Sequence, residues 1–259
     1  MGELSRAIKE YEMSGVASQI DYGKFYLYSI ITHSTAIEGS TVTEVENQLL
    51  FDEGIGCRKP LTEQLMNLDL KKAYEEAFRL ADSHEDFTPK LMCYLSGILM
   101  KNTGSLYNTI AGSFNSAEGE LRLINVSAGR GGRSYMAWQK VPDRLRDFCS
   151  WLNDERRRLK DEDVENVYKL SFEAHYRLVS IHPWADGNGR MARLVMNMIQ
   201  QEFGAVLSVV QKERRAEYIE SLAKSQTADD PTAFISFMMD HHIYNIARQI
   251  QEYREALEK

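Results

Sequence analysis

Apolar residues recur three and four positions apart along most of this chain, a spacing that is typical of amphipathic helices and not of strands. On a helix this spacing places the apolar residues in a stripe along one face, and such stripes are found at 164–178, 191–199 and 232–257. Another follows Pro142, a residue favoured in the first turn of a helix, and consists of Leu145, Phe148, Cys149 and Leu152. Because a helix cannot bury its own stripe, we expect a mainly α-helical fold in which the helices pack on one another.

The composition is that of an ordinary globular protein. The chain has 259 residues, of which 43% are hydrophobic, with 16 glycines and 5 prolines, so collagen-like and disordered classes are excluded. The net charge is −7, from 31 Lys and Arg against 38 Asp and Glu. This acidic balance argues against nucleic acid or anionic lipid as a partner of the whole surface, but it is compatible with a local basic site.

The cysteines indicate a reducing compartment. Cys57, Cys93 and Cys149 are odd in number, lie far apart and form no CxxC pair, so we expect neither a disulfide framework nor a zinc site. The first residues lack the apolar region of a signal peptide, and the longest mostly apolar stretch, 91–100, is far shorter than the ~20 residues of a membrane span. We therefore expect a cytoplasmic protein with no membrane partner.

One segment departs from helical spacing. Residues 121–126 favour a strand, 127–132 are rich in glycine and serine, and 133–138 favour a second strand. We predict a small β-hairpin there. A charged connection near 82–86 separates an N-terminal helical region, 1–85, from the rest of the chain, 86–259.

The most unusual run lies between two helical stripes, at 181–193, and reads IHPWADGNGRMAR. Gly187 and Gly189 allow the backbone to approach an anion closely, at the N-terminus of the helix that follows. Arg190 and Arg193, three positions apart, lie on one face of that helix, and Asn197 extends this polar face. The pattern predicts a phosphate-binding site.

Two further side chains give this site its chemistry. His182 titrates near neutrality and suits a general base that takes a proton from a hydroxyl nucleophile. Asp186 is a hard carboxylate beside the phosphates and suits Mg²⁺. Together these groups indicate phosphoryl or nucleotidyl transfer, in which positioning and charge neutralisation supply most of the rate.

The run resembles the signature of the Fic (filamentation induced by cAMP) domain family, HPFx(D/E)GN(G/K)RxxR, which residues 182–193 match with one change. Trp184 stands in place of the family's Phe. The resemblance extends from about Phe25 to Phe237. It implies a Fic-type helical bundle core, over 86–259, with a hairpin flap at about 120–138, the signature loop and helix at 181–203, and C-terminal helices.

The resemblance also implies an activity, the transfer of AMP from ATP to a Ser, Thr or Tyr hydroxyl of a target protein, with release of pyrophosphate. His182 would be the catalytic base and Asp186 the ligand of Mg²⁺. The phosphates would bind to Gly187, Asn188, Gly189, Arg190 and Arg193. The partners implied are ATP and a target protein, which in some cases is the enzyme itself.

Two more sites follow from the resemblance. Ser134, Tyr135 and Met136 would belong to the flap that clamps the target segment by strand-like pairing. Tyr218 would lie near the adenine, and the amide that often follows eight residues later is Gln226 here instead of Asn.

An inhibitory motif, (S/T)xxxE(G/N), precedes the core in related Fic proteins, and Ser34, Glu38 and Gly39 match it at the end of a helix predicted over about 22–39. Ser34 and Glu38 lie on one face. The resemblance implies that Glu38 pairs with Arg193, so that the arginine is withheld from the γ-phosphate and the resting enzyme is nearly inactive.

Other interpretations remain open at this stage. Related proteins remove AMP with the help of the inhibitory glutamate, or transfer UMP, phosphocholine or phosphate; the last group usually has Lys where Gly189 stands. A catalytically silent interaction module and a homodimer are also compatible with the sequence. Read without the motif, Asp186 is a helix N-cap, Arg190 and Arg193 are solvated helix charges, and Glu38 is an ordinary helix end.

Overall fold

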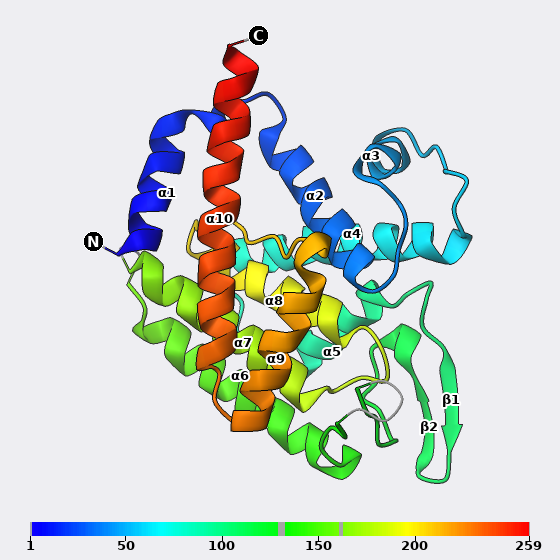
Figure 1. Ribbon diagram of the computed structural model, residues 1–259. Coiled ribbons are helices and arrows are strands. Elements are labelled where there is room, and N and C mark those ends of the chain that lie inside the picture. The colour runs from blue at the N-terminus through cyan, green and yellow to red at the C-terminus, as the bar shows by residue number, and fades with distance from the viewer. Residues whose placement is uncertain (1, 129–132, 161–162, 259) are drawn as a thin grey trace.

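The structure is a computed structural model and describes residues 2–128, 133–160 and 163–258. These residues form a helical bundle with one two-stranded sheet (Figure 1). The elements in chain order are α1 (Glu3–Ser14), α2 (Tyr22–Ile37), α3 (Glu44–Asp52), α4 (Leu61–Asp82), α5 (Pro89–Leu99), β1 (Leu106–Thr109), β2 (Gly112–Asn115), α6 (Val141–Arg158), α7 (Val164–Ile181), α8 (Asn188–Glu202), α9 (Arg215–Ala228) and α10 (Thr232–Leu257).

The prediction of a mainly α-helical fold is confirmed, and the local signals that start the helices are visible. Thr43 and Glu46 form a capping box at the start of α3. Thr88 caps α5 with Pro89 in the first helical position, and Pro142 lies in the first turn of α6. None of the helices in the described ranges has the length and apolar character needed to cross a membrane.

The helix α8 occupies the centre of the bundle and packs against α7, α4 and α5 (Figure 1). Its residues from Met191 to Gln200 are all buried. Asn197 is part of this core, because its amide donates to the Tyr74 hydroxyl at 3.0 Å and accepts from the Ser208 N–H at 2.9 Å. The expected extension of the polar face to Asn197 is therefore wrong, since this side chain fixes neighbouring elements.

The predicted hairpin at 121–138 is not a regular hairpin. Its described residues make one isolated antiparallel bridge, Ser127 with Ser134, and its tip at 129–132 lies outside the described residues. The regular strands are β1 and β2, where Tyr107 pairs with Phe114 and their rings stack at 4.8 Å. Two backbone hydrogen bonds flank this bridge, from the Ala128 N–H to the Arg133 carbonyl at 2.9 Å and from the Tyr135 N–H to the Val126 carbonyl at 3.0 Å, and a buried side chain adds further contacts, as described below.

Gly119 follows β2 and lies directly against α5. Its φ is +74°, and a Cβ at this position would come within 1.9 Å of the Cys93 carbonyl oxygen. The position therefore excludes every side chain, by backbone conformation and by space. The Gly119 carbonyl also accepts a hydrogen bond from the indole of Trp184 at 3.0 Å, so this contact links α5 to the signature loop.

We predict that Gly119→Ala lowers the free energy of unfolding by about 3 kcal/mol, because the new methyl group meets backbone that cannot move independently. Urea unfolding followed by circular dichroism measures it. Gly54→Ala is the matched control, since Gly54 has φ +70° but a Cβ added there would meet no atom within 4 Å, and it should cost only about 1–2 kcal/mol. Equal losses in the two variants would contradict the steric argument.

Candidate active site

The signature loop connects α7 to α8 through two left-handed residues. His182 has φ +53° and closes α7 by donating its N–H to the Leu178 carbonyl at 3.0 Å. Gly187 has φ +79° and precedes α8, and a Cβ there would come within 2.7 Å of the Met100 sulfur. The first N–H groups of α8 have no carbonyl partner within the helix, so this end of α8 attracts an anion.

The loop is braced from inside by Asn188 and Trp184. The Asn188 side chain accepts from the Trp184 N–H at 3.1 Å and donates to the Trp184 carbonyl at 2.9 Å. Trp184 is fully buried and holds Gly119 through its indole N–H. The Asn188 amide is thus used by the loop itself, and its backbone N–H is the group left for a phosphate.

His182 is held as a neutral ring. Its Nδ1 lies 3.3 Å from the Val179 carbonyl, which assigns the proton to Nδ1 and leaves Nε2 as the basic nitrogen. Burial lowers the pKa of His182 to about 4. The Tyr135 ring stacks on the imidazole at 3.7 Å, so the flap segment covers the base.

Arg190 is a buried cation with unused donors. Its side chain is 2% exposed, its Nη2 lies 3.3 Å from the Met100 sulfur, and its ion pair with Asp186 is long, at 3.7 Å. Its Nε and Nη1 have no partner in the part of the chain that the structure describes. Because buried unsatisfied N–H groups are costly, this guanidinium is suited to receive an anion.

Asp186 presents an exposed carboxylate at the mouth of the loop. One oxygen accepts from the Gly187 N–H at 2.6 Å, and the other faces Arg190. Residues 2–128, 133–160 and 163–258 contain no group of three or more His, Cys, Asp or Glu that could hold a metal ion. A cation at Asp186 would therefore take its other ligands from water and bound phosphates, as Mg²⁺ commonly does.

Arg193 is tied to the end of α2. It donates from Nε to the Ser34 hydroxyl at 2.8 Å and from Nη2 to the Ser34 carbonyl at 2.9 Å and to Glu38 Oε1 at 2.6 Å. Burial alone would raise the pKa of Glu38, but the charge of Arg193 outweighs it and lowers this pKa. A Cβ at Gly189 would come within 2.5 Å of Glu38 Oε1, so the glutamate reaches over the start of α8.

A cavity of about 230 Å³ brings these groups together. We call it the central cavity, and its lining includes Glu38, His182, Gly189, Arg193 and Tyr218. The Tyr218 hydroxyl is hydrogen-bonded to Nε2 of the buried His175 at 2.9 Å and accepts from Arg193 Nη1 at 3.3 Å. Some of the predicted inhibitory, catalytic and phosphate-binding residues thus meet in one place, whereas Asp186 and Arg190 do not line this cavity.

Residues 86–200 match the model of the Fic/DOC family. The chain thus contains a region similar to the Fic/DOC family over 115 of its 259 residues. The family match runs from α5 through most of α8, and therefore includes the loop with His182 and both arginines, Arg190 and Arg193.

The chain is also similar to curated relatives and solved structures beyond residues 86–200. It is 28% identical over 230 residues to protein adenylyltransferase fic-1 of Caenorhabditis elegans and 28% identical over 214 residues to protein adenylyltransferase Fic of Aedes aegypti. These matches cover 87% and 81% of this chain, but only 41% and 39% of the relatives, so the chain spans about two fifths of their length.

Two solved structures share the fold. A Fic-domain signaling protein from Bacteroides thetaiotaomicron has a TM-score of 0.77 at 20% identity, with 96% of this chain and 97% of that chain covered. Fic-1 (residues 134–508 of that protein) from C. elegans also has a TM-score of 0.77, at 22% identity, with 98% and 72% covered. The whole bundle is thus a Fic fold, including the helices outside 86–200.

Arg122 is a residue of this site that the motif did not reveal. It is 1% exposed and donates to three carbonyls, those of His182 at 2.8 Å, Ile124 at 2.7 Å and Met136 at 2.7 Å. It therefore fastens the segment 121–138 to the signature loop, in addition to the short backbone pairing between 126–128 and 133–135. The one signal in the sequence is a single cation inside the apolar run 121–126.

We predict that Arg122→Met lowers the free energy of unfolding by about 3 kcal/mol, because three buried carbonyls lose their donor. Hydrogen exchange should accelerate in 121–128 and 133–138 more than in α10. Arg79→Met is the control, since Arg79 pairs with Glu76 on the surface. Unchanged exchange of the flap segment in Arg122→Met would disprove the fastening role.

Proposed function

We propose that this protein is a Mg²⁺-dependent adenylyltransferase that moves AMP from ATP to a Ser, Thr or Tyr hydroxyl of a target protein. The observation that carries the proposal is geometric: the half-buried His182, with Nδ1 at the Val179 carbonyl, lies beside the N-terminus of α8, where the buried Arg190 has two donors without a partner among the described residues. Support comes from the relatives, which are named protein adenylyltransferases and align with most of this chain.

In this proposal the phosphates of ATP lie along the start of α8. The backbone N–H groups of Gly187, Asn188 and Gly189 and the free donors of Arg190 hold the oxygens, and Arg193 holds the terminal phosphate. His182 Nε2 takes the proton of the attacking hydroxyl. The oxygen then forms the new bond to the α-phosphorus, and the bond to the pyrophosphate oxygen breaks.

The residues present fit a magnesium ion bound through one carboxylate. Asp186 is the exposed carboxylate beside the phosphate-binding N–H groups, and Mg²⁺ typically uses one or two carboxylates plus phosphate oxygens. When bound, the ion supplies positive charge to the phosphates and the leaving pyrophosphate. The free cysteines are in keeping with a reducing, cytoplasmic environment.

Regulation follows from the Glu38–Arg193 pair. The glutamate already occupies the guanidinium that the terminal phosphate needs, and its carboxylate lies over Gly189, where an anion would bind. ATP would then bind in a pose that is unsuited to in-line attack. We infer that the resting protein is autoinhibited and that displacement of Glu38 activates it.

We predict that Glu38→Gly raises AMP transfer about 10–100-fold over the unchanged protein, and that His182→Ala in the same background lowers it about 100-fold or more. Incorporation from ATP labelled in the α-phosphate, into the protein itself or an added acceptor, measures both. Glu53→Gly is the matched control, because Glu53 also ends a helix and precedes a glycine of positive φ, yet lies exposed outside the site. Equal transfer by all proteins would refute the proposal.

The loss of activity at low pH should follow the protonation of His182. Its folded-state pKa is about 4, below the ordinary 6.5, so the protonated, inactive imidazolium forms only in acid. We predict that kcat/KM of Glu38→Gly is level from about pH 8 to 6 and falls with a midpoint below 6. A pH series of initial rates tests this, and a midpoint at or above 6.5 would contradict it.

A further inference from the structure

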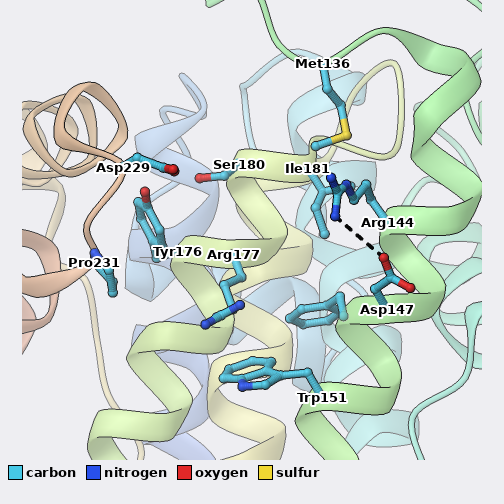
Figure 2. A pocket seen from close by; sticks show the side chains of 11 residues that line it. Met136, Arg144, Asp147, Trp151, Tyr176, Arg177, Ser180, Ile181, Asp229 and Pro231 are labelled. Atoms are coloured by element: carbon cyan, nitrogen blue, oxygen red, sulfur yellow. Dashed lines mark ion pairs between the residues drawn. The ribbon is translucent and has the colours of Figure 1, made fainter.

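A larger cavity of about 630 Å³ opens beside α7, just before the catalytic loop. Its walls come from α6, α7, the flap segment and the turn between α9 and α10 (Figure 2). We call it the side groove. Its lining includes Met136, Trp151, Tyr176, Ser180, Ile181 and Asp229.

An intermediate cavity lies between the side groove and the central cavity and shares wall residues with each. This cavity of about 310 Å³ shares Tyr135 and Gln226 with the central cavity, and shares Tyr176, Ser180 and Asp229 with the side groove. Ser180 and Ile181 also directly precede His182 in the chain. The side groove therefore lies close to His182, on the side where Met136 and Tyr135 stand.

One end of the side groove gathers oxygen atoms. Figure 2 shows the Asp229 carboxylate, the Ser180 hydroxyl and the Tyr176 hydroxyl pointing toward one another. Tyr176 already donates its proton to the Ser225 carbonyl at 3.2 Å, and Ser180 accepts from Gln226 at 3.4 Å. Both Tyr176 and Asp229 therefore present acceptors here, and a donor-rich cation matches this end.

The arginine side chains that line the groove already have partners. Arg144 pairs with Asp147 at 3.7 Å, and Arg177 pairs with Glu173 at 2.6 Å while its guanidinium lies 4.1 Å above the Trp151 ring. Arg133, in the intermediate cavity, donates to the Gln226 carbonyl. Within the described residues the Asp229 carboxylate has no ion pair, so its charge is available to a partner.

We propose that the side groove binds a segment of the acceptor protein and that Asp229, with Ser180, pairs with a Lys or Arg of that segment. The proposal rests on the proposed transferase function. The apolar stem of such a side chain would lie along Ile181 and Met136, with its charged head at the oxygen-rich end. Because an extended chain advances ~3.3 Å per residue, the basic residue stands within a few positions of the modified hydroxyl.

The test uses Glu38→Gly enzyme, ATP labelled in the α-phosphate, and peptides with one central Thr among Ala and Gly residues. A single Arg is placed in turn at each position on either side, and a second set carries Glu instead. We expect Arg at one or two neighbouring positions to raise the rate about tenfold over Glu. Asp229→Asn should abolish this preference.

Asp229→Asn suits the test because Asn tolerates the left-handed backbone that Asp229 adopts, with φ +52°. Glu220→Gln is the matched control, since it also removes one exposed carboxylate from α9 but lies outside the groove. It should keep the Arg preference. Rates that are independent of Arg position, or a preference that persists in Asp229→Asn, would overturn the proposal.

A binding measurement separates this proposal from the transferase function. Fluorescein-labelled Arg and Glu peptides are titrated with His182→Ala protein, and anisotropy reports binding without turnover. Tighter binding of the Arg peptide, lost in Asp229→Asn, supports the groove even where Glu38→Gly transfers no AMP, a result that would refute the function alone. Equal or absent binding of the two peptides refutes the groove.

Discussion

A guanidinium buried at the centre of the bundle is the constraint on which much of this molecule depends. Arg193 is 2% exposed and projects from α8, the most buried helix. A charge in such a place requires a counter-charge and hydrogen-bond acceptors. Ser34 and Glu38 provide both from α2, so the electrostatics of the core fix where the N-terminal helices lie.

The same requirement connects the parts of the site. Tyr218, from α9, gives Arg193 a further acceptor, and its hydroxyl is oriented by the buried His175. Arg215, at the start of α9, donates to the Ile37 carbonyl at the end of α2. Elements that are distant in sequence thus meet around one cation, and the central cavity is the space that remains between them.

The sequence was most informative where the chemistry is local. Helix α10 spans 232–257 as predicted, because its apolar spacing is long and regular. The motif likewise placed His182, Asp186 and both arginines, since one loop and one helix turn carry them. The pairing of Glu38 with Arg193 was implied only by the family resemblance, and no periodicity would have shown it.

What the sequence did not reveal depends on contacts between distant segments. Arg122 reads as a cation in a β-prone run, but its three carbonyl partners lie in its own segment, in the flap and at the end of α7. β1 and β2 are four residues each, too short for alternation to distinguish them from loops. The sequence also did not show that the Asn188 side-chain amide closes the loop on Trp184, which leaves its backbone N–H as the group proposed for a phosphate.

The ion pair between Glu38 and Arg193 also couples the position of Glu38 to the binding of nucleotide. Suppose that the Glu38–Arg193 ion pair weakens the productive binding of ATP by some factor. Because coupling free energies are reciprocal, productively bound ATP must then weaken the ion pair by the same factor. Glu38 lies at the end of α2, so the nucleotide would act on the packing of a whole helix. Under the proposed function, α2 would then be the element whose stability depends on whether nucleotide is bound.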